Sequence, residues 1–225
     1  YDLNSEFDAS EVAALFINST HGIGIDFAQA GLNGPSIFPV TSPAARLEWT
    51  LAEGWRLRRA VLAGVPGDPE RPKVTTVELG DGDGALLVAE IDREAAGYRF
   101  VLGHWRFTTT FDDLARVDAA GDPLRRRGTH GTYAFVEGGL WQASTGPRRL
   151  TGVARIGFAS PDVNPVERTL RLGLVLHSPF TEAGEDQLGI AFATYRNGEP
   201  YRRGAAARGE TLLRSETNVE LTWRV

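Results

Sequence analysis

The stretch Ser215–Val225, SETNVELTWRV, carries the pattern that decides the fold. Its apolar and polar residues alternate one by one: Thr217, Val219, Leu221, Trp223 and Val225 against Glu216, Asn218, Glu220, Thr222 and Arg224. Successive side chains of a β-strand point to opposite faces. This segment therefore predicts a strand with one apolar face and one charged face.

The same alternation recurs along the chain and predicts about ten strands, within the range of bacterial β-barrels. They are Glu11–Ser19, Arg46–Leu51, Trp55–Gly64, Ala85–Ile91, Tyr98–Thr108, Tyr133–Ala143, Leu150–Ala159, Thr169–His177, Gln187–Tyr195 and Ser215–Val225. Long and short links alternate between them, and the long ones include Val65–Asp83 and Thr109–Thr129. Short turns at one rim and long loops at the other are typical of a transmembrane barrel.

We therefore expect an all-β fold, an antiparallel up-and-down transmembrane β-barrel with long extracellular loops and short periplasmic turns. Residues 1–225 would form a single barrel domain. Most segments approach the ~9–11 residues that a tilted strand needs to cross a bilayer. Alternation alone also fits a soluble β-sandwich that binds carbohydrate, such as a lectin-like module, and this alternative stays open.

Three segments are less regular. In Trp55–Gly64 the adjacent Arg58 and Arg59 break the alternation, which predicts a β-bulge there. Tyr98–Thr108 changes phase between Phe100 and Val101. The pattern of Tyr133–Ala143 does not assign its residues to faces.

Composition excludes several classes of function. The chain has no cysteine, which removes disulfide scaffolds, thiol catalysis and zinc–thiolate sites. Its net charge is -5, and no dense basic run suggests nucleic-acid binding. No stretch reaches the ~18 apolar residues of a membrane-spanning helix. We find no hydrolase, metalloprotease or P-loop motif, so we expect neither an enzyme nor a cofactor or metal site.

Several blocks of the sequence are similar to one known family. They are YDLNSEFD at Tyr1–Asp8, LFINS at Leu15–Ser19, GLNGPSIFP at Gly31–Pro39, AVLAGVPGDP at Ala60–Pro69, DQLGIAFA at Asp186–Ala193 and ELTWRV at Glu220–Val225. These blocks resemble the carbohydrate-selective porins of the OprB type. The resemblance implies a bacterial outer-membrane channel of about sixteen strands that passes sugars by diffusion. With fewer strands than that, the chain is interpreted as an internal segment of such a porin.

The polar faces supply candidates for the pore wall and for sugar contact: Arg46, Glu48, Arg56, Arg58, Arg155, Arg171, Glu216, Glu220 and Arg224. Arginine offers several donors and carboxylates offer acceptors, which suits the hydroxyl groups of a sugar. Binding in a channel must also be weak enough for release. For any single residue the alternative, that its charge only solvates the lumen or pairs with a neighbour, is equally open.

The long segment Gly22–Pro39 is the candidate constriction loop, with Asn33, Gly34 and Pro35 at its centre. Its apolar residues could anchor it against the wall, or it could pack on itself at the surface. The expected partners are sugars as permeants and outer-membrane lipid, without nucleic acid. A homo-oligomer is possible, because porins often associate through their lipid-facing surfaces.

Overall fold

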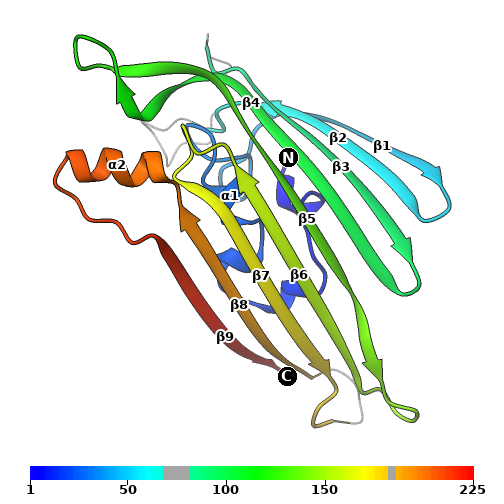
Figure 1. The fold of residues 1–225 in the computed structure, drawn as a ribbon. Helices are drawn as coiled ribbons and strands as arrows, with labels where there is room; N and C mark the ends of the chain where they lie inside the picture. The colour runs from blue at the N-terminus through cyan, green and yellow to red at the C-terminus, as the bar shows by residue number, and fades with distance from the viewer. Residues whose placement is uncertain (68–81, 182–185) are drawn as a thin grey trace.

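The computed structural model describes residues 1–67, 82–181 and 186–225, and it contains one antiparallel sheet of nine strands. Each strand pairs with its neighbour in the chain, in the order β1 to β9. The strands are β1 Ala44–Ala52, β2 Trp55–Ala63, β3 Ala85–Ala95, β4 Tyr98–Val117, β5 Pro123–Gln142, β6 Arg149–Ala159, β7 Val166–His177, β8 Gln187–Asn197 and β9 Ser215–Arg224. The sheet curls like part of a barrel wall (Figure 1). Within the described residues β1 and β9 are not paired, so the barrel is not closed.

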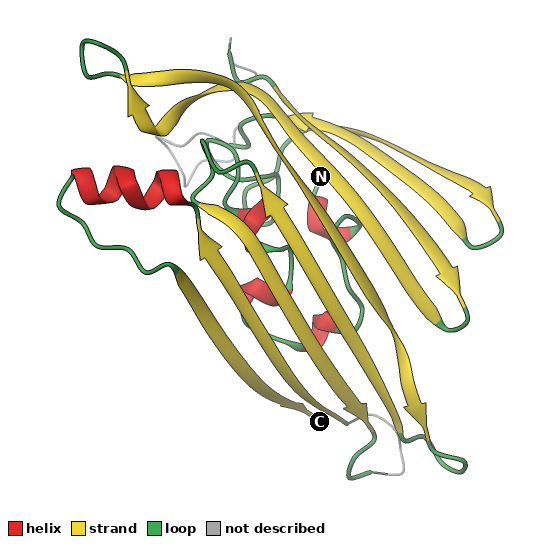
Figure 2. Cartoon of the chain, in the orientation of Figure 1, coloured by secondary structure: helices red, strands yellow, loops and turns green. Residues whose placement is uncertain are grey.

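Residues 1–42, which we call the inward segment, lie on the concave side of this wall (Figure 2). They form short helical turns: η1 Leu3–Ser5, η2 Ala13–Leu15, η3 Ser19–His21 and α1 Ile25–Ala28. Phe27 stacks on Trp105 of β4 with ring centroids 4.9 Å apart, and both side chains are fully buried. The apolar core therefore lies between the wall and the inward segment.

The prediction of a strand at Glu11–Ser19 is wrong, because this part of the chain forms η2 and the start of η3. The Ser10 hydroxyl accepts a hydrogen bond from the Ala13 amide at 3.0 Å. The Asn18 side chain accepts one from the Thr20 amide, also at 3.0 Å. Such local bonds offer the backbone an alternative to a sheet ladder. The remaining predicted segments are strands, which makes nine instead of ten.

The two rims differ as predicted at most links. However, residues 178–186, which join β7 to β8 at the short-turn rim, are a longer link than residues 160–165, which join β6 to β7 at the other rim. One long link is also not a loop. Most of Thr109–Thr129 continues β4 and β5 as a projecting hairpin, with a turn at residues 118–122. Cross-strand ion pairs join Arg125 to Asp112 at 2.5 Å and Arg126 to Asp113 at 2.8 Å. Opposite charges facing each other stabilise strand pairing, and alternation did not reveal them. In the link Val65–Asp83, residues 68–81 lie outside the described residues.

A helix follows β8 at this same rim: α2, Glu199–Ala207. It packs against the extended end of β4, where Ala205 is fully buried. Within the described ranges, no helix has the length and apolar character needed to cross a bilayer.

The alternating faces are separated as the sequence predicts. On β7 the leucines Leu170, Leu172 and Leu174 are 37%, 44% and 42% exposed on the convex face, whereas Arg171 is fully buried on the concave side. A soluble sandwich would cover these leucines with a second sheet. The described residues contain a single sheet, so they do not support the lectin-like alternative.

The strand β2 is regular where the sequence predicted a break. No bulge lies at Arg58 and Arg59, which pair in register with Glu90 and Ala89 of β3. Arg58 is buried on the concave side and Arg59 is exposed on the convex side, so the alternation is intact. The two adjacent arginines therefore point to opposite faces of the sheet, and the strand continues without interruption.

The same holds for β4, which pairs without a register shift from Tyr98 to Phe107. Phe100 is exposed on the convex face, whereas Trp105 and Phe107 point inward to the inward segment. On β5 Tyr133, Phe135 and Glu137 point inward, and a register shift against β6 falls between Gly139 and Trp141.

Candidate functional site

Arg155 of β6 holds the inward segment against the wall through two buried carboxylates. Its Nε and Nη2 atoms donate to Asp8 at 2.7 and 2.6 Å, and its Nη1 atom donates to Asp26 at 2.8 Å. All three side chains are fully buried. A buried charge is tolerated when it is paired and hydrogen-bonded. This triad therefore fixes two distant points of the inward segment to one position on the wall.

The triad fits in its place because two neighbouring residues, Gly24 and Gly157, have no side chain. A Cβ atom on Gly24 would lie 2.1 Å from the Arg155 Cζ atom, and one on Gly157 would lie 2.2 Å from Asp26 Oδ2. The Gly24 amide also donates to Asp8 at 2.9 Å. A larger residue at either position would displace the guanidinium or the carboxylate.

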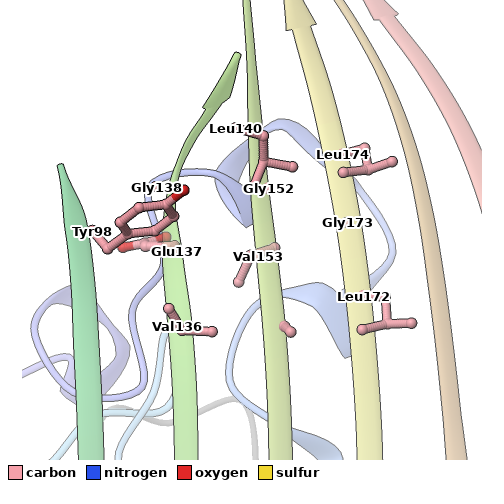
Figure 3. A pocket seen from close by; sticks show the side chains of 11 residues that line it. Tyr98, Val136, Glu137, Gly138, Leu140, Gly152, Val153, Leu172, Gly173 and Leu174 are labelled. Carbon is pink, nitrogen blue, oxygen red and sulfur yellow. The ribbon is translucent and has the colours of Figure 1, made fainter. Parts of the chain in front are cut away.

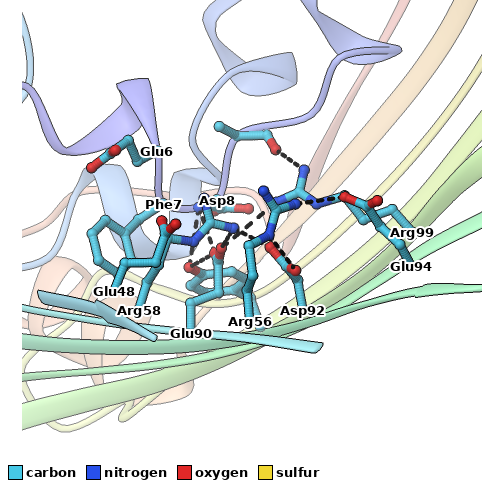
Figure 4. A network of polar contacts seen from close by, with 12 residues as sticks. Glu6, Phe7, Asp8, Glu48, Arg56, Arg58, Glu90, Asp92, Glu94 and Arg99 are labelled. Carbon is cyan, nitrogen blue, oxygen red and sulfur yellow. Dashed lines mark hydrogen bonds and ion pairs between the residues drawn. The ribbon is translucent and has the colours of Figure 1, made fainter. Parts of the chain in front are cut away.

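A second polar network covers the adjoining wall on β2, β3 and β4 (Figure 4), and Glu137 extends it to β5. Arg58 contacts Glu90 at 2.7 Å and pairs with Asp92. Arg99 lies 3.5 Å from Asp92 and 3.1 Å from Glu137. The carboxylates on one strand therefore balance the guanidinium groups on its neighbours, as charge-assisted bonds require.

The inward segment is hydrogen-bonded to this network through its backbone and one hydroxyl. The Asp8 amide donates to Glu90 at 2.9 Å. Glu137 accepts bonds from the Ser10 hydroxyl at 2.5 Å and from the Val12 amide at 3.2 Å. These bonds satisfy backbone groups that would otherwise be orphaned in an irregular segment.

Arg171 of β7 is buried beneath η3 and does not face an open lumen. Its Nη1 atom donates to the carbonyl oxygens of His21 and Gly22, both at 2.6 Å. Burial lowers the pKa of the His21 imidazole below its ordinary value, and the Arg171 guanidinium lowers it further. The folded protein therefore favours the neutral form of His21.

Glu220 of β9 binds the middle of the inward segment. It accepts hydrogen bonds from the amides of Ile17 at 2.8 Å and Asn18 at 2.9 Å. Glu216 and Arg224 lie on the same concave face of β9 and are exposed. Within the described residues Arg224 forms no ion pair.

At the opposite edge of the sheet, the candidate arginines are paired. Arg46 lies 2.7 Å from Glu6 of the inward segment and 2.5 Å from Glu48. Arg56 lies 2.5 Å from Glu94 on β3. These side chains remain partly exposed, so they line the concave surface with both donors and acceptors.

The candidate constriction segment Gly22–Pro39 lies within the inward segment. Ile23 and Phe27 are buried against the wall and anchor it. At its centre Asn33 is exposed and donates to the Pro66 carbonyl at 2.7 Å, whereas Pro35 is buried. Gly34 has φ +73°, a left-handed conformation that favours glycine.

Clefts remain between the inward segment and the half of the wall nearest the short turns, and Glu11 borders three of them. One of about 350 Å³ lies beside Arg56 and Arg99, and one of about 610 Å³ beside Arg99 and Thr151. A third, of about 200 Å³, lies beside Thr151 and Arg224. An exposed carboxylate among guanidinium groups offers acceptors next to donors.

The convex face carries a groove of a different kind, with a volume of about 340 Å³ (Figure 3). Tyr98, Val136, Leu140, Leu172 and Leu174 line it, together with the glycines at 138 and 152. Its lining is almost wholly apolar, as expected for a surface that faces hydrocarbon. It offers few polar groups to a sugar.

All of the predicted wall residues lie on the concave face, but they divide into two groups. Arg58, Arg155 and Arg171 are buried under the inward segment. The others are partly or fully exposed: Arg46, Glu48, Arg56, Glu216, Glu220 and Arg224. Whether any of them contacts sugar stays a prediction.

Sequence reasoning missed Glu11 and the acidic partners of the wall arginines. Glu90 and Asp92 could have been found, because they alternate with apolar residues on one strand. Asp8 and Asp26 had no such signal, since Arg155 lies more than a hundred residues away in the sequence. The described residues gather no group of three or more His, Asp or Glu side chains that could hold a metal ion.

Comparison with known proteins agrees with this architecture. The family model described as "Carbohydrate-selective porin, OprB family" matches residues 1–225. The chain belongs to this family. The porin is therefore an outer-membrane protein of bacteria.

A solved structure, "High pH structure of Pseudomonas putida OprB", has the same fold as this porin chain. The TM-score is 0.78 at 17% sequence identity. The match covers 99% of this chain and 58% of that one. No curated protein matches the porin chain.

The buried His21 predicts a dependence of stability on pH. In the unfolded chain its pKa is about 6.5, and in the folded chain it is lower. As the pH falls below about 6.5, the unfolded state binds more protons than the folded state, so the free energy of unfolding decreases. Urea titrations of the folded porin from pH 8 to pH 5 should show this decline, and His21→Phe should reduce it. An undiminished decline in His21→Phe would contradict the assignment.

Proposed function

We propose that the full-length porin admits sugars by passive diffusion along the concave side of its wall. One observation carries the proposal: a single curved sheet has an apolar convex face and a charged concave face, with an inward segment narrowing its interior. An apolar exterior suits lipid, and a polar interior suits an aqueous passage. Family membership supports carbohydrate as the class of solute.

The proposed route passes Glu11, at the clefts between the inward segment and the wall. Arg56, Arg99 and Arg224 border these clefts and supply donors, while Glu11 supplies acceptors. A neutral polyol could exchange its water hydrogen bonds for these groups one after another. Because the groups are spread along the route, no single position would hold the sugar firmly.

In this proposal Arg155 and Arg171 do not contact the solute. They hold the inward segment, which sets the width of the passage. Asn33, Gly34 and Pro35 would act through the same segment. Outer-membrane lipid would cover the convex face, which is also where copies of the chain would associate in a homo-oligomer.

The proposal is tested by reconstituting the full-length porin in liposomes and following their swelling in isotonic sugars. We expect swelling in monosaccharides, slower swelling in larger oligosaccharides, and faster entry of sugars than of zwitterionic amino acids of equal size. Equal exclusion of all small sugars would contradict a sugar channel. Equal entry of sugars and size-matched amino acids would contradict carbohydrate selectivity.

Replacing Glu11 with glutamine is expected to change the ion preference of the channel. It removes a negative charge beside Arg56, Arg99 and Arg224 and leaves the shape nearly unchanged. At contact distance in water such a charge is worth about 1 kcal/mol, so the anion-to-cation permeability ratio should rise about two- to fivefold. The reversal potential across a planar bilayer under a salt gradient measures this ratio.

Glu53→Gln is the matched control for Glu11→Gln. It makes the same substitution in the turn between β1 and β2, away from the clefts that Glu11 borders. The control should leave the reversal potential close to that of the wild type. Equal shifts in both variants would mean that Glu11 does not lie on the route.

A further inference from the structure

A polar strip interrupts the apolar convex face on β4 and β5. It consists of His104 and Arg106 on β4 and of Arg127, His130 and Thr132 on β5, and we call it the basic strip. The two histidines and both arginines are exposed, and Thr132 is half-buried. Alternation puts His104, Arg106, His130 and Thr132 on the same face as the exposed leucines. Arg127 lies beyond a register shift between the two strands, where it pairs with Thr110 and is exposed.

The strip is continuous across the two strands. Arg106 pairs in register with His130, and His104 with Thr132. The two imidazole rings lie 6.1 Å apart, and His104 Nδ1 lies 2.9 Å from the Thr132 hydroxyl oxygen. Imidazole, guanidinium and hydroxyl groups thus form one contiguous patch of hydrogen-bonding groups.

The strip lies where the apolar surface ends. On the same face of β4, Phe100 and Leu102 are exposed on the side of the short turns. Leu87 of β3 and Phe158 of β6 flank the strip and are also exposed. Beyond it the two strands continue into the projecting hairpin (Figure 1). In the orientation typical of such barrels, this is the level of the outer-leaflet headgroups.

The charge of the strip is not neutralised by its neighbours. Within the described residues neither Arg106 nor Arg127 forms an ion pair. The acidic residue nearest along this face of β4 is Asp112, which pairs with Arg125 at 2.5 Å. A guanidinium group at a lipid-facing position is costly unless an anion or water meets it.

We propose that the basic strip binds the phosphate groups of a phosphorylated lipid in the outer leaflet. Arginine matches phosphate geometry with two parallel hydrogen bonds, and the strip adds imidazole and hydroxyl donors. The apolar face below would contact the acyl chains of the same lipid. A neutral sugar has no charge to match the strip, and a second copy presenting the same strip would add like charges.

The proposal is tested by measuring lipid binding to the full-length porin in detergent. The probes are a diphosphorylated acylated glucosamine disaccharide and the same lipid after dephosphorylation. Native mass spectrometry counts the lipid molecules retained. We expect the wild type to retain the phosphorylated lipid, and the double variant Arg106→Gln/Arg127→Gln to bind it about tenfold more weakly, as loss of one charge-assisted bond or more would give.

Arg93→Gln is the matched control. Arg93 also faces outward, on β3, but it lies near the short turns, over Trp55 and bonded to the Glu53 carbonyl at 2.6 Å. This control should bind the lipid as the wild type does, and a heat-modifiability gel should show that all variants are folded. Equal retention of the dephosphorylated lipid, no retention by the wild type, or an equal loss in Arg93→Gln would each overturn the proposal.

Discussion

Replacing Arg155 with methionine is expected to lower the free energy of unfolding by about 3–5 kcal/mol, because it leaves buried carboxylates without their partner. Asp8 and Asp26 would lose the hydrogen bonds that Arg155 donates to them at 2.6–2.8 Å. Neither carboxylate can reach water without moving the inward segment. We therefore also expect a larger and noisier single-channel conductance.

The stability of Arg155→Met is measured from the temperature at which the compact band disappears in heat-modifiability gels. Arg224→Met is the matched control, because Arg224 is exposed on the same concave face and forms no ion pair within the described residues. A triple variant that also carries Asp8→Asn and Asp26→Asn should recover part of the lost stability, since it removes the unpaired charges as well. If Arg155→Met and Arg224→Met were equally stable, Arg155 would not anchor the segment.

Replacing Leu172 with arginine is the second prediction with a large effect. Leu172 is exposed on the convex face of β7, between Leu170 and Leu174. A lipid-facing arginine near the bilayer midplane costs about 2–4 kcal/mol. The folded yield in lipid vesicles, and its midpoint in urea, should fall accordingly.

The matched control for this variant is Leu170→Arg on the same strand. Leu170 is two residues nearer the long-link rim, next to the outward-facing Arg168. The cost of such an arginine falls with distance from the midplane, toward about 0–1 kcal/mol at the interface, so Leu170→Arg should lose less stability than Leu172→Arg. A large loss for Leu172→Arg with a small loss for Leu170→Arg would place the hydrocarbon on the convex face. The absence of any loss in Leu172→Arg would mean that this face meets water.

The alternation in the sequence was sufficient to predict the wall because it is a local property. In a strand such as Thr169–His177, the order of the residues alone determines which side chains lie on each face, whichever strand it pairs with. The pattern predicts a strand at Glu11–Ser19, where the structure has helical turns, because the local hydrogen bonds to the side chains of Ser10 and Asn18 leave no trace in the hydrophobic pattern. The predicted bulge at Arg58 and Arg59 is absent, because Arg58 faces inward and Arg59 faces outward in a regular strand. A charged residue on each face looks like a break in the alternation when the surroundings of the two faces are not known.

The sequence by itself determined nine of the ten predicted strands and their order, since neighbours in the chain are neighbours in the sheet. It also determined which side chains share a face wherever the alternation is regular, as on β7 and β9. Only the tertiary structure decided which charged side chains of the concave face are buried in ion pairs, as Arg155 is, and which are exposed, as Arg224 is. Residues 1–42 fold back onto the concave side, where Asp8 and Asp26 meet Arg155 across most of the chain. That contact depends on the curvature of the whole sheet and on the space left by Gly24 and Gly157, and no local pattern encodes it.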